Sequence, residues 1–196
     1  MCPDGTPLRL KTDRLELTPL GASDAEKLHT LWTTPQVREF LWDGRIISSD
    51  QTLAIVTESS RLFAAHGFGI WGAHLSRNDA LAGFGGLWYF RDPPELELVY
   101  GVAVEHWRKG LAREAAGAIV SYAFQVLGHE VIRASTDSRN RASVRVLAKL
   151  EFVFERHAIV EERDTLFYRL IKAAPSHPPS GGGSTAVRRA TRKETW

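Results

Sequence analysis

Apolar and polar residues alternate in several short stretches of the chain, a pattern that predicts β-strands. The first stretch covers residues 14–17 (Arg-Leu-Glu-Leu) and is followed by Pro19. Six further strands are predicted at residues 68–75, 81–90, 96–104, 131–135, 152–155 and 165–171. Asn78-Asp79 supplies turn chemistry between two of them, so a hairpin is expected there. The last two strands are expected to pair antiparallel across the charged stretch 161–164.

Apolar residues at helical spacing predict four helices between these strands. The predicted helices begin at the capping box Ser23-x-x-Glu26, at Ser49-Asp50, at Gly110 and at Asn140. Gly67 and Gly128 are expected to end the second and third helices. In the fourth helix Val144, Leu147 and Ala148 are expected to face inward.

The resulting order is β-α-α-β-β-β-α-β-α-β-β, which predicts a single α/β (α+β) domain with a mixed sheet and helices on both faces. The length of 196 residues agrees with one domain. Residues 1–12 are interpreted as a flexible leader and 13–172 as the folded domain. Residues 173–196 combine proline, glycine and basic residues with almost no apolar ones, so a disordered basic tail is expected.

Composition excludes several classes of protein. The formal net charge is only +2, and basic residues gather in the tail, so nucleic-acid binding is not favoured. Cys2 is the single cysteine, which excludes a disulfide within the chain and a cysteine-built zinc site. The seven histidines lack metal-ligand spacing, so no metal is expected. No apolar run approaches the ~18 residues that span a bilayer, and a cytoplasmic protein is predicted.

The stretch 102–115 carries the most specific chemistry. A strand runs into a basic loop with a glycine, and the loop runs directly into a helix. The first N–H groups of a helix lack partners and lie at the positive end of its dipole, so they bind anions such as phosphate. Gly110 and Ala112 leave the backbone accessible, while Arg108, Lys109 and Arg113 add positive charge. The alternative interpretation is a solvated basic turn.

Residues 107–112 (Trp-Arg-Lys-Gly-Leu-Ala) resemble the acyl-CoA signature of the GNAT superfamily, (Arg/Gln)-x-x-Gly-x-(Gly/Ala). Trp107 stands at the Arg/Gln position, as in the ribosomal-protein acetyltransferase (RimJ/RimL-like) branch. Two further segments, Glu97-Leu98-Val99-Tyr100 and Asn140-Arg141-Ala142-Ser143, are similar to motifs of that branch and occur in the same order. Val99 and Glu151 replace glycines of the pattern. The resemblance spans residues 12–171.

This resemblance implies a GNAT-like sheet of about seven strands that splays apart between the fourth and fifth strands, 96–104 and 131–135. Acetyl-CoA is expected to bind in that opening as co-substrate. The implied cofactor-binding residues are Val102, Ala103, Val104, Arg108, Lys109, Gly110, Leu111, Ala112, Arg113 and Asn140. Asn140 would also be a good helix cap in its own right.

The resemblance also implies catalytic roles. An amine attacks the thioester after losing a proton, and Glu97 is the candidate general base. A backbone N–H such as that of Val102 would stabilise the oxyanion. Ser143 would protonate the leaving thiolate, with Tyr100 as a second option. The alternatives are that Glu97 faces water on its strand and that Ser143 only caps a helix.

The acceptor side is expected in the aromatic-rich first half of the chain. Trp42, Asp43 and Trp88 are the candidate substrate-binding residues, although core packing explains most aromatic side chains. The acceptor would be a primary amine, either a protein N-terminus or a small molecule.

The sequence therefore predicts an acetyl-CoA-dependent N-acetyltransferase that works by direct attack in a ternary complex. The alternative is a non-catalytic acyl-CoA-binding or sensor domain, which would bind CoA without turnover. A third hypothesis is nucleic-acid binding by the tail, which would depend strongly on salt. No membrane partner is expected, and a homodimer stays open.

Overall fold

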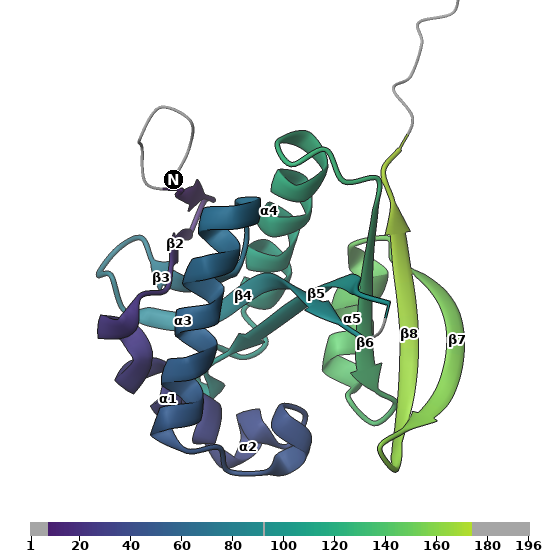
Figure 1. Ribbon diagram of the computed structural model, residues 1–196, viewed down its shortest axis with the longest axis horizontal. Helices are drawn as coiled ribbons and strands as arrows, with labels where there is room; N and C mark the ends of the chain where they lie inside the picture. Colours follow the sequence, from purple (N-terminus) through teal and green to yellow (C-terminus); the bar gives the residue numbers. More distant parts are fainter. Residues whose placement is uncertain (1–7, 92, 174–196) are drawn as a thin grey trace, which may run out of the picture.

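The computed structural model describes residues 8–91 and 93–173 of the chain. Its strands form one sheet in the order β1-β2-β3-β4-β5-β6-β8-β7 (Figure 1). The strands are β1 (Leu10–Lys11), β2 (Leu15–Pro19), β3 (Ile70–Leu75), β4 (Leu81–Phe90), β5 (Glu95–Val102), β6 (Val131–Asp137), β7 (Val153–Val160) and β8 (Arg163–Ile171). Neighbouring strands are antiparallel except β5 and β6, which are parallel. The expected mixed sheet is confirmed, and the short strand β1 brings the number of strands to eight.

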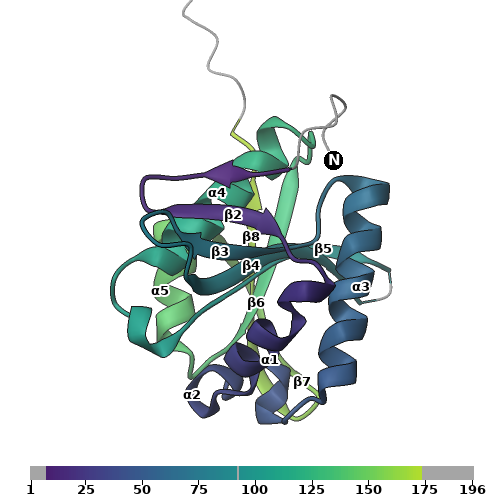
Figure 2. The same ribbon diagram turned by 90° about the vertical axis from the view of Figure 1, so that its left-hand side faces the viewer.

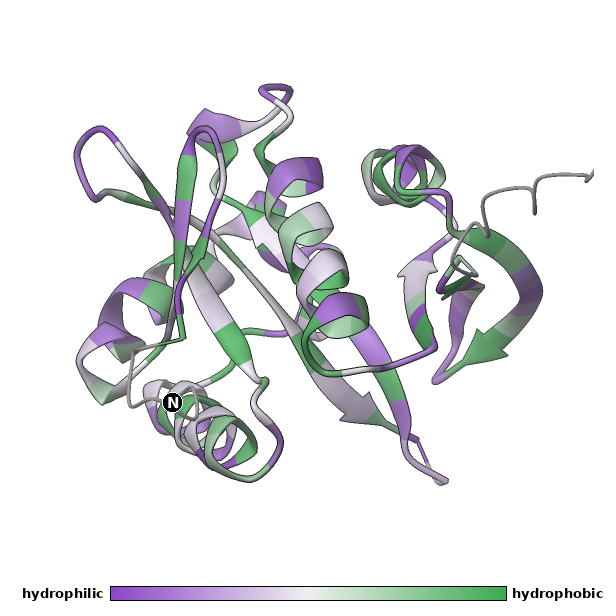
Figure 3. Cartoon of the chain, turned by 90° about the horizontal axis from the view of Figure 1, so that it is seen from above, coloured by the Kyte–Doolittle hydropathy of each residue, from purple (hydrophilic) through white to green (hydrophobic). Residues whose placement is uncertain are grey.

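Helices cover both faces of this sheet, as predicted. They are α1 (Ala25–Thr33), α2 (Pro35–Arg38), α3 (Ser49–His66), α4 (Leu111–Gln125) and α5 (Arg141–Lys149), with short 3-10 turns η1 (Ala22–Asp24), η2 (Trp42–Gly44) and η3 (Val104–His106). Figure 2 shows the sheet between α1 and α3 on one side and α4 and α5 on the other. Bands of polar and apolar residues follow one another along the helices and strands (Figure 3), as the two side-chain periodicities lead one to expect.

Two groups of buried side chains hold the layers together. The larger group lies under α4 and includes Leu17, Trp71, Ile119 and Ile132, all nearly inaccessible to solvent. The smaller group lies under α1 and α3 and includes Leu28, Trp32, Val56, Ile70 and Phe84. Burial of such apolar surface is the main favourable contribution to folding.

The ends of the helices follow local sequence signals in most cases. Ser48 accepts a hydrogen bond from the Gln51 N–H at 3.1 Å at the start of α3, and Gly67 ends the helix with a left-handed φ of 76°. Helix α4 ends at Gln125, slightly before Gly128. In α5, Leu147 is buried, whereas Ala148 is exposed against expectation because it lies on the solvent side of the helix.

The predicted capping box at Ser23 is wrong. Residues 22–24 form the turn η1, and α1 begins after it without a side-chain cap. The carboxylate of Asp24 instead accepts a hydrogen bond from the Gly21 N–H at 3.0 Å. Asp and Ser side chains both bond to nearby backbone N–H groups, and here Asp24 satisfies the turn.

Strands β5 and β6 separate almost as soon as they meet. Their only paired residues in the described part of the chain are Glu97 and Arg133, whereas β4 and β5 are paired from Phe90–Glu95 to Gly83–Val102. The expected opening between the strands at 96–104 and 131–135 is therefore present. We call this opening the splay; it begins beyond Glu97 and Arg133.

The domain boundaries differ from the expected ones at the N-terminal side. Leu8 is only 6% exposed and β1 pairs with β2, so residues 8–12 belong to the fold rather than to a leader. Residues 1–7 and, apart from residue 173, the expected disordered tail 173–196 lie outside the described residues. Among the helices of the described residues, none combines the length and the apolar character needed to cross a bilayer.

Candidate active site

The loop before α4 leaves the first amides of that helix without partners. Gly110 precedes the helix in a left-handed conformation with φ of 79°, which a glycine adopts without strain. No side chain of the described residues caps α4, whereas Asn140 caps α5. The free N–H groups and the helix dipole make this end of α4 suited to a phosphate.

The predicted cationic residues surround these amides. Arg108, Lys109 and Arg113 are exposed, and within the described residues none of the three side chains forms an ion pair. Leu111 is buried in the larger core, so only its backbone can face a ligand. Ala112 is partly exposed and adds no bulk. These features fit a diphosphate at the start of α4.

Trp107 links this loop to the end of β5. Its indole Nε1 donates a hydrogen bond of 2.8 Å to the carbonyl oxygen of Val102, although the residue is 45% exposed. The sequence marks Trp107 as a motif position only, and it was not expected among the site residues. Its place in the signature, where the general pattern has Arg or Gln, was the signal that could have found it.

The backbone next to the splay is only partly available to a ligand. Val102 is the last residue of β5 and is partly buried. The N–H of Ala103 donates to the Ala82 carbonyl at 2.9 Å, so it is already used within the protein. Val104 begins the turn η3 and packs against the smaller core.

Glu97 lies where β5 and β6 part, and it is only 3% exposed. One carboxylate oxygen, Oε2, accepts a hydrogen bond from Ser135 Oγ at 2.8 Å. The other, Oε1, faces the guanidinium of Arg91 in an ion pair without a well-aligned hydrogen bond. The alternative that Glu97 faces water is therefore wrong, because Ser135 and Arg91 cover its carboxylate on that face of the strand.

Arg91 is a site residue that sequence reasoning missed. It follows β4 with a φ of 68°, forms a second ion pair of 3.3 Å with Glu95, and places its guanidinium 4.7 Å from the ring centre of Phe167. Burial lowers the pKa of Arg91, while the nearby Glu95 raises it. The Arg91 guanidinium therefore places a positive charge beside the carboxyl group of Glu97. No local pattern indicated this contact, because it depends on how the β4–β5 turn folds over β8.

Three other predicted residues meet across the splay. The hydroxyl groups of Tyr100 and Ser143 are 2.8 Å apart, and the Asn140 side chain accepts a hydrogen bond of 3.0 Å from the Ser143 N–H. Burial raises the pKa of Tyr100 to about 12, although the Ser143 hydrogen bond opposes this. Tyr100 is therefore a protonated donor at neutral pH. Asn140 caps α5, and its amide nitrogen is left for another partner.

The candidate base and acid lie on opposite faces of β5. Side chains alternate along a strand, so Glu97 and Tyr100 point to different sides. Tyr100 packs against the core under α4, while Glu97 contacts Ser135 on the other face. The splay is the place where a ligand could reach both faces.

The predicted acceptor residues lie beside the smaller core. Trp42 has a left-handed φ of 55°, and its ring centre lies 5.1 Å from that of Trp32. Trp88 is partly buried and is the β4 partner of Glu97. The indole N–H groups of Trp32 and Trp42 are buried without a hydrogen-bond partner in the described residues. The side chain of Asp43 lies outside the described part of the structure.

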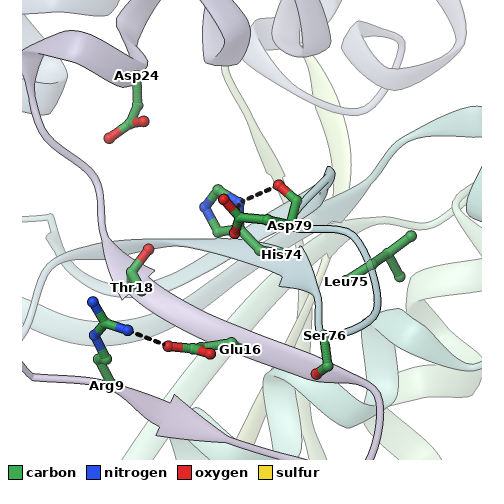
Figure 4. A pocket seen from close by; sticks show the side chains of 8 residues that line it. All are labelled: Arg9, Glu16, Thr18, Asp24, His74, Leu75, Ser76 and Asp79. Atoms are coloured by element: carbon green, nitrogen blue, oxygen red, sulfur yellow. Dashed lines mark hydrogen bonds and ion pairs between the residues drawn. The ribbon is translucent and has the colours of Figure 1, made fainter.

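A hollow elsewhere on the surface does not coincide with these residues. It lies beside β1, β2 and β3, several strands away from the splay, and is lined by Arg9, Glu16, Thr18, Asp24, His74, Leu75, Ser76 and Asp79 (Figure 4). The ion pair between Arg9 and Glu16, 2.6 Å long, occupies one wall. Among the described residues, no cluster of three or more His, Cys, Asp or Glu side chains could hold a metal ion.

The splay and the free N–H groups at the start of α4 suit a ligand that carries a diphosphate, and the family comparison gives the class of enzyme. Residues 14–153 match the family described as acetyltransferase (GNAT) domain, so the chain belongs to the GNAT acetyltransferase family. It is an acyltransferase whose acyl donor is acetyl-CoA. The expected enzyme class and co-substrate are thereby confirmed.

Individual proteins agree with this assignment. The chain is 29% identical over 144 residues to "Uncharacterized N-acetyltransferase YoaA" of Bacillus subtilis (strain 168), covering 73% of this chain and 81% of that protein. The fold is similar to that of RimL, ribosomal L7/L12 alpha-N-protein acetyltransferase in complex with coenzyme A, with a TM-score of 0.71, 16% identity and coverage of 83% and 97%. It is also similar to yncA of Salmonella typhimurium with acetyl-CoA, with a TM-score of 0.66, 18% identity and coverage of 85% and 98%.

Proposed function

We propose that this enzyme acetylates a primary amine by direct attack of that amine on acetyl-CoA in a ternary complex. The observation that carries the proposal is that a site suited to a diphosphate lies next to the opening between β5 and β6. The uncapped start of α4 offers amides for a diphosphate, and the splay beside it opens between a carboxylate on one face and two hydroxyl groups on the other.

The start of α4 would hold the diphosphate of acetyl-CoA. The N–H groups of residues 109–113 would bind its oxygens, and the exposed side chains of Arg108, Lys109 and Arg113 would add charge. The pantetheine would run along the end of β5 beside Val102 and Val104. The amide nitrogen of Asn140 would donate to it, because the Asn140 oxygen is already used in capping α5.

In the reaction, the amine nitrogen forms a bond to the thioester carbon and the carbon–sulfur bond breaks. The amine must first lose a proton, since amines of the lysine type have a reference pKa of about 10.4. We assign this proton to Glu97, reached through the Ser135 hydroxyl group, which donates to the carboxylate and is itself partly exposed. The leaving thiolate takes a proton from the hydroxyl pair of Tyr100 and Ser143. The second amine proton is released as the amide forms and restores the hydroxyl pair.

The acceptor we favour is the N-terminal amine of a protein. The motif positions Trp107, Glu97 and Ser143 are those of the RimJ/RimL-like branch, and RimL, one of the proteins with this fold, is named for such an activity. Trp42 and Trp88 would border the acceptor on the side of the smaller core. A small-molecule amine is the other acceptor class, and an amine panel separates the two.

The first test is a thermal-shift titration with acetyl-CoA of the parent, Gly110→Glu and Gly128→Glu. Both glycines are left-handed, with φ of 79° and 74°, and a side chain at Gly128 would meet nothing within 4 Å. Both substitutions therefore bring similar backbone strain and the same charge to the region of α4. We expect acetyl-CoA to raise the melting temperature of the parent and of Gly128→Glu but not of Gly110→Glu.

Turnover is tested next by thiol release with peptides of free N-terminus, blocked peptides and small amines. Release with free peptides alone supports the favoured acceptor. Stabilisation by acetyl-CoA without thiol release on any amine would instead indicate the non-catalytic acyl-CoA-binding domain. No stabilisation at millimolar acetyl-CoA would contradict the proposed cofactor site.

A further inference from the structure

Arg14, immediately before β2, reaches across to the loop that precedes α4. Its backbone N–H donates to Glu114 Oε1 at 2.9 Å, and its Nε donates to Glu114 Oε2 at 2.7 Å. Its Nη1 donates to the carbonyl oxygen of Lys109 at 2.8 Å. One arginine thus binds both the first turn of α4 and the residue before Gly110.

Glu114 is fixed from a second direction. Thr12 Oγ1 donates to Glu114 Oε1 at 2.6 Å, and the same oxygen atom of Thr12 accepts the Leu15 N–H at 2.9 Å. Burial would raise the pKa of Glu114, but the hydrogen bonds from Thr12 and Arg14 and the arginine charge together lower it. The carboxylate therefore neutralises Arg14 and holds its guanidinium in one orientation.

The loop that Arg14 touches has an unfavourable backbone. Arg108 has a φ of 59°, a conformation that costs free energy in a residue with a Cβ atom. Contacts from outside the loop must hold it, since the preference of the residue itself is against it. Trp107 binds the Val102 carbonyl on one side, and Arg14 binds the Lys109 carbonyl on the other.

The planarity of the peptide bond gives the Arg14 contact a consequence for the ligand. The Lys109 carbonyl and the Gly110 N–H belong to one peptide unit, and in a trans peptide they point in opposite directions. Holding the carbonyl toward Arg14 therefore turns the Gly110 N–H the other way. A Cβ atom at Gly110 would lie 3.5 Å from Arg14 Nη2, so the guanidinium borders this peptide closely.

We propose that Arg14 is a positioning residue for acetyl-CoA, which orients the Gly110 amide toward the diphosphate. It acts through the Lys109 carbonyl and not through its own charge, because Glu114 already neutralises that charge. This proposal rests on the proposed placement of the diphosphate at residues 109–113. It predicts that the orientation of the guanidinium matters and that a positive charge alone does not suffice.

The test compares Arg14→Met, Arg14→Lys and Arg9→Met. Arg9 is a matched control, because its side chain is exposed to a similar degree as that of Arg14 (54% against 51%) and also pairs with a glutamate. That glutamate, Glu16, lies on β2 and not on α4. The dissociation constant of acetyl-CoA is measured by calorimetry, KM and kcat by thiol release, and the melting temperature without ligand for each variant.

We expect Arg14→Met to raise the dissociation constant and the KM for acetyl-CoA about tenfold, the effect of ~1.4 kcal/mol, with kcat unchanged. Arg14→Lys should bind acetyl-CoA as weakly as Arg14→Met. The compact ammonium group of lysine lacks the planar fork with which Arg14 holds the Glu114 carboxylate and the Lys109 carbonyl together. Arg9→Met should behave like the parent.

Several results would overturn the proposal. If Arg14→Met binds acetyl-CoA as tightly as the parent, Arg14 has no role in binding it. If Arg14→Lys restores the affinity in full, Arg14 acts through its positive charge and not through its orientation. If Arg14→Met has a lower kcat and a lower melting temperature but an unchanged KM for acetyl-CoA, Arg14 only stabilises the fold. If the parent itself does not bind acetyl-CoA, the proposed function fails instead, and this outcome is distinct from the others.

Discussion

The hydroxyl groups of Tyr100 and Ser143 are 2.8 Å apart, on two elements that are separated by 43 positions in the chain. One belongs to β5 and the other to the first turn of α5, so the pair bridges the splay on the side of α4. Because burial raises the pKa of Tyr100 to about 12, this pair keeps its protons at the pH where an amine can attack. The arrangement suits the protonation of a leaving thiolate.

Removal of the Tyr100 hydroxyl is expected to slow the reaction. In Tyr100→Phe we expect kcat to fall about 10²-fold, the typical size of a general-acid contribution, with little change in acetyl-CoA affinity. Ser143→Ala should lower kcat in the same direction, and the double variant should be no slower than the slower single one, since the two act as one unit. Thiol-release kinetics measures this, and independent, additive losses would contradict a shared role.

The raised pKa of Tyr100 also makes stability depend on alkaline pH. Between the ordinary tyrosine pKa of 10.0 and the folded value of about 12, the unfolded chain loses its proton while the folded chain keeps it. The contribution of Tyr100 to stability should therefore be constant below pH 10 and fall as the pH rises through this window, by at most about 3 kcal/mol. Denaturant unfolding from pH 8 to 12 checks this. Tyr100→Phe should lack this part of the decline, and an identical decline in that variant would refute the assignment.

Glu97 and Arg91 should show separate contributions to stability and turnover. Glu97→Gln leaves the partly buried Arg91 with only Glu95, so we expect a loss of about 1–3 kcal/mol and a large fall in kcat. Arg91→Met combined with Glu97→Gln should recover part of the stability, because no uncompensated charge remains, but not the turnover. Denaturant unfolding and thiol release are measured on all three variants. Recovery of turnover in the double variant would show that Glu97 is not the base.

Glu114 should make the domain sensitive to acid. Its folded pKa lies below the ordinary value of 4.5, so its contribution is fully present above that pH and is lost as the pH falls through the folded value. Glu114→Gln should be less stable than the parent at neutral pH, and the difference should narrow in acid. Urea unfolding between pH 3 and 7 tests this, and a gap that stays constant with pH would contradict it.

Trp107→Phe should weaken acetyl-CoA binding while leaving the fold nearly unchanged. The substitution keeps an aromatic ring but loses the hydrogen bond to the Val102 carbonyl, and the ring is exposed enough that stability should change by less than ~1 kcal/mol. We expect a several-fold weaker dissociation constant by calorimetry. Phe90→Leu, at a site of similar exposure on β4, serves as control and should keep the parent affinity.

Much of the fold and of the cofactor region could be predicted because the signals are local. The strand, loop and helix around Gly110 are adjacent in the chain, as are the Asn140 cap and the left-handed Gly67. The predicted cap of α1 was wrong for a local reason too, because it is Asp24 and not Ser23 whose side chain accepts a backbone hydrogen bond there. The branch motifs also marked Tyr100, Ser143 and Asn140, although Ser143 and Tyr100 were expected as alternative proton donors and not as a hydrogen-bonded pair.

The remaining site residues depend on distant partners. Glu97 was expected on a strand beside the splay, but only the register of β4, β5 and β6 placed Ser135 and Arg91 against the Glu97 carboxylate. The strand β1 was missed because Leu10–Lys11 is too short to carry a periodic pattern and exists through its pairing with β2.

By itself, the sequence determined the order of the longer elements, the basic glycine loop at the start of α4 and the candidate hydroxyl and carboxylate residues. Only the tertiary structure decided which of them act on one another. Arg14 meets Glu114 across 100 positions of chain, and Arg91 covers Glu97 from a turn over β8. The reason is physical: periodicity and capping are written in neighbouring residues, whereas the partner of a buried charge is set by strand register and helix packing, which no short stretch of chain contains.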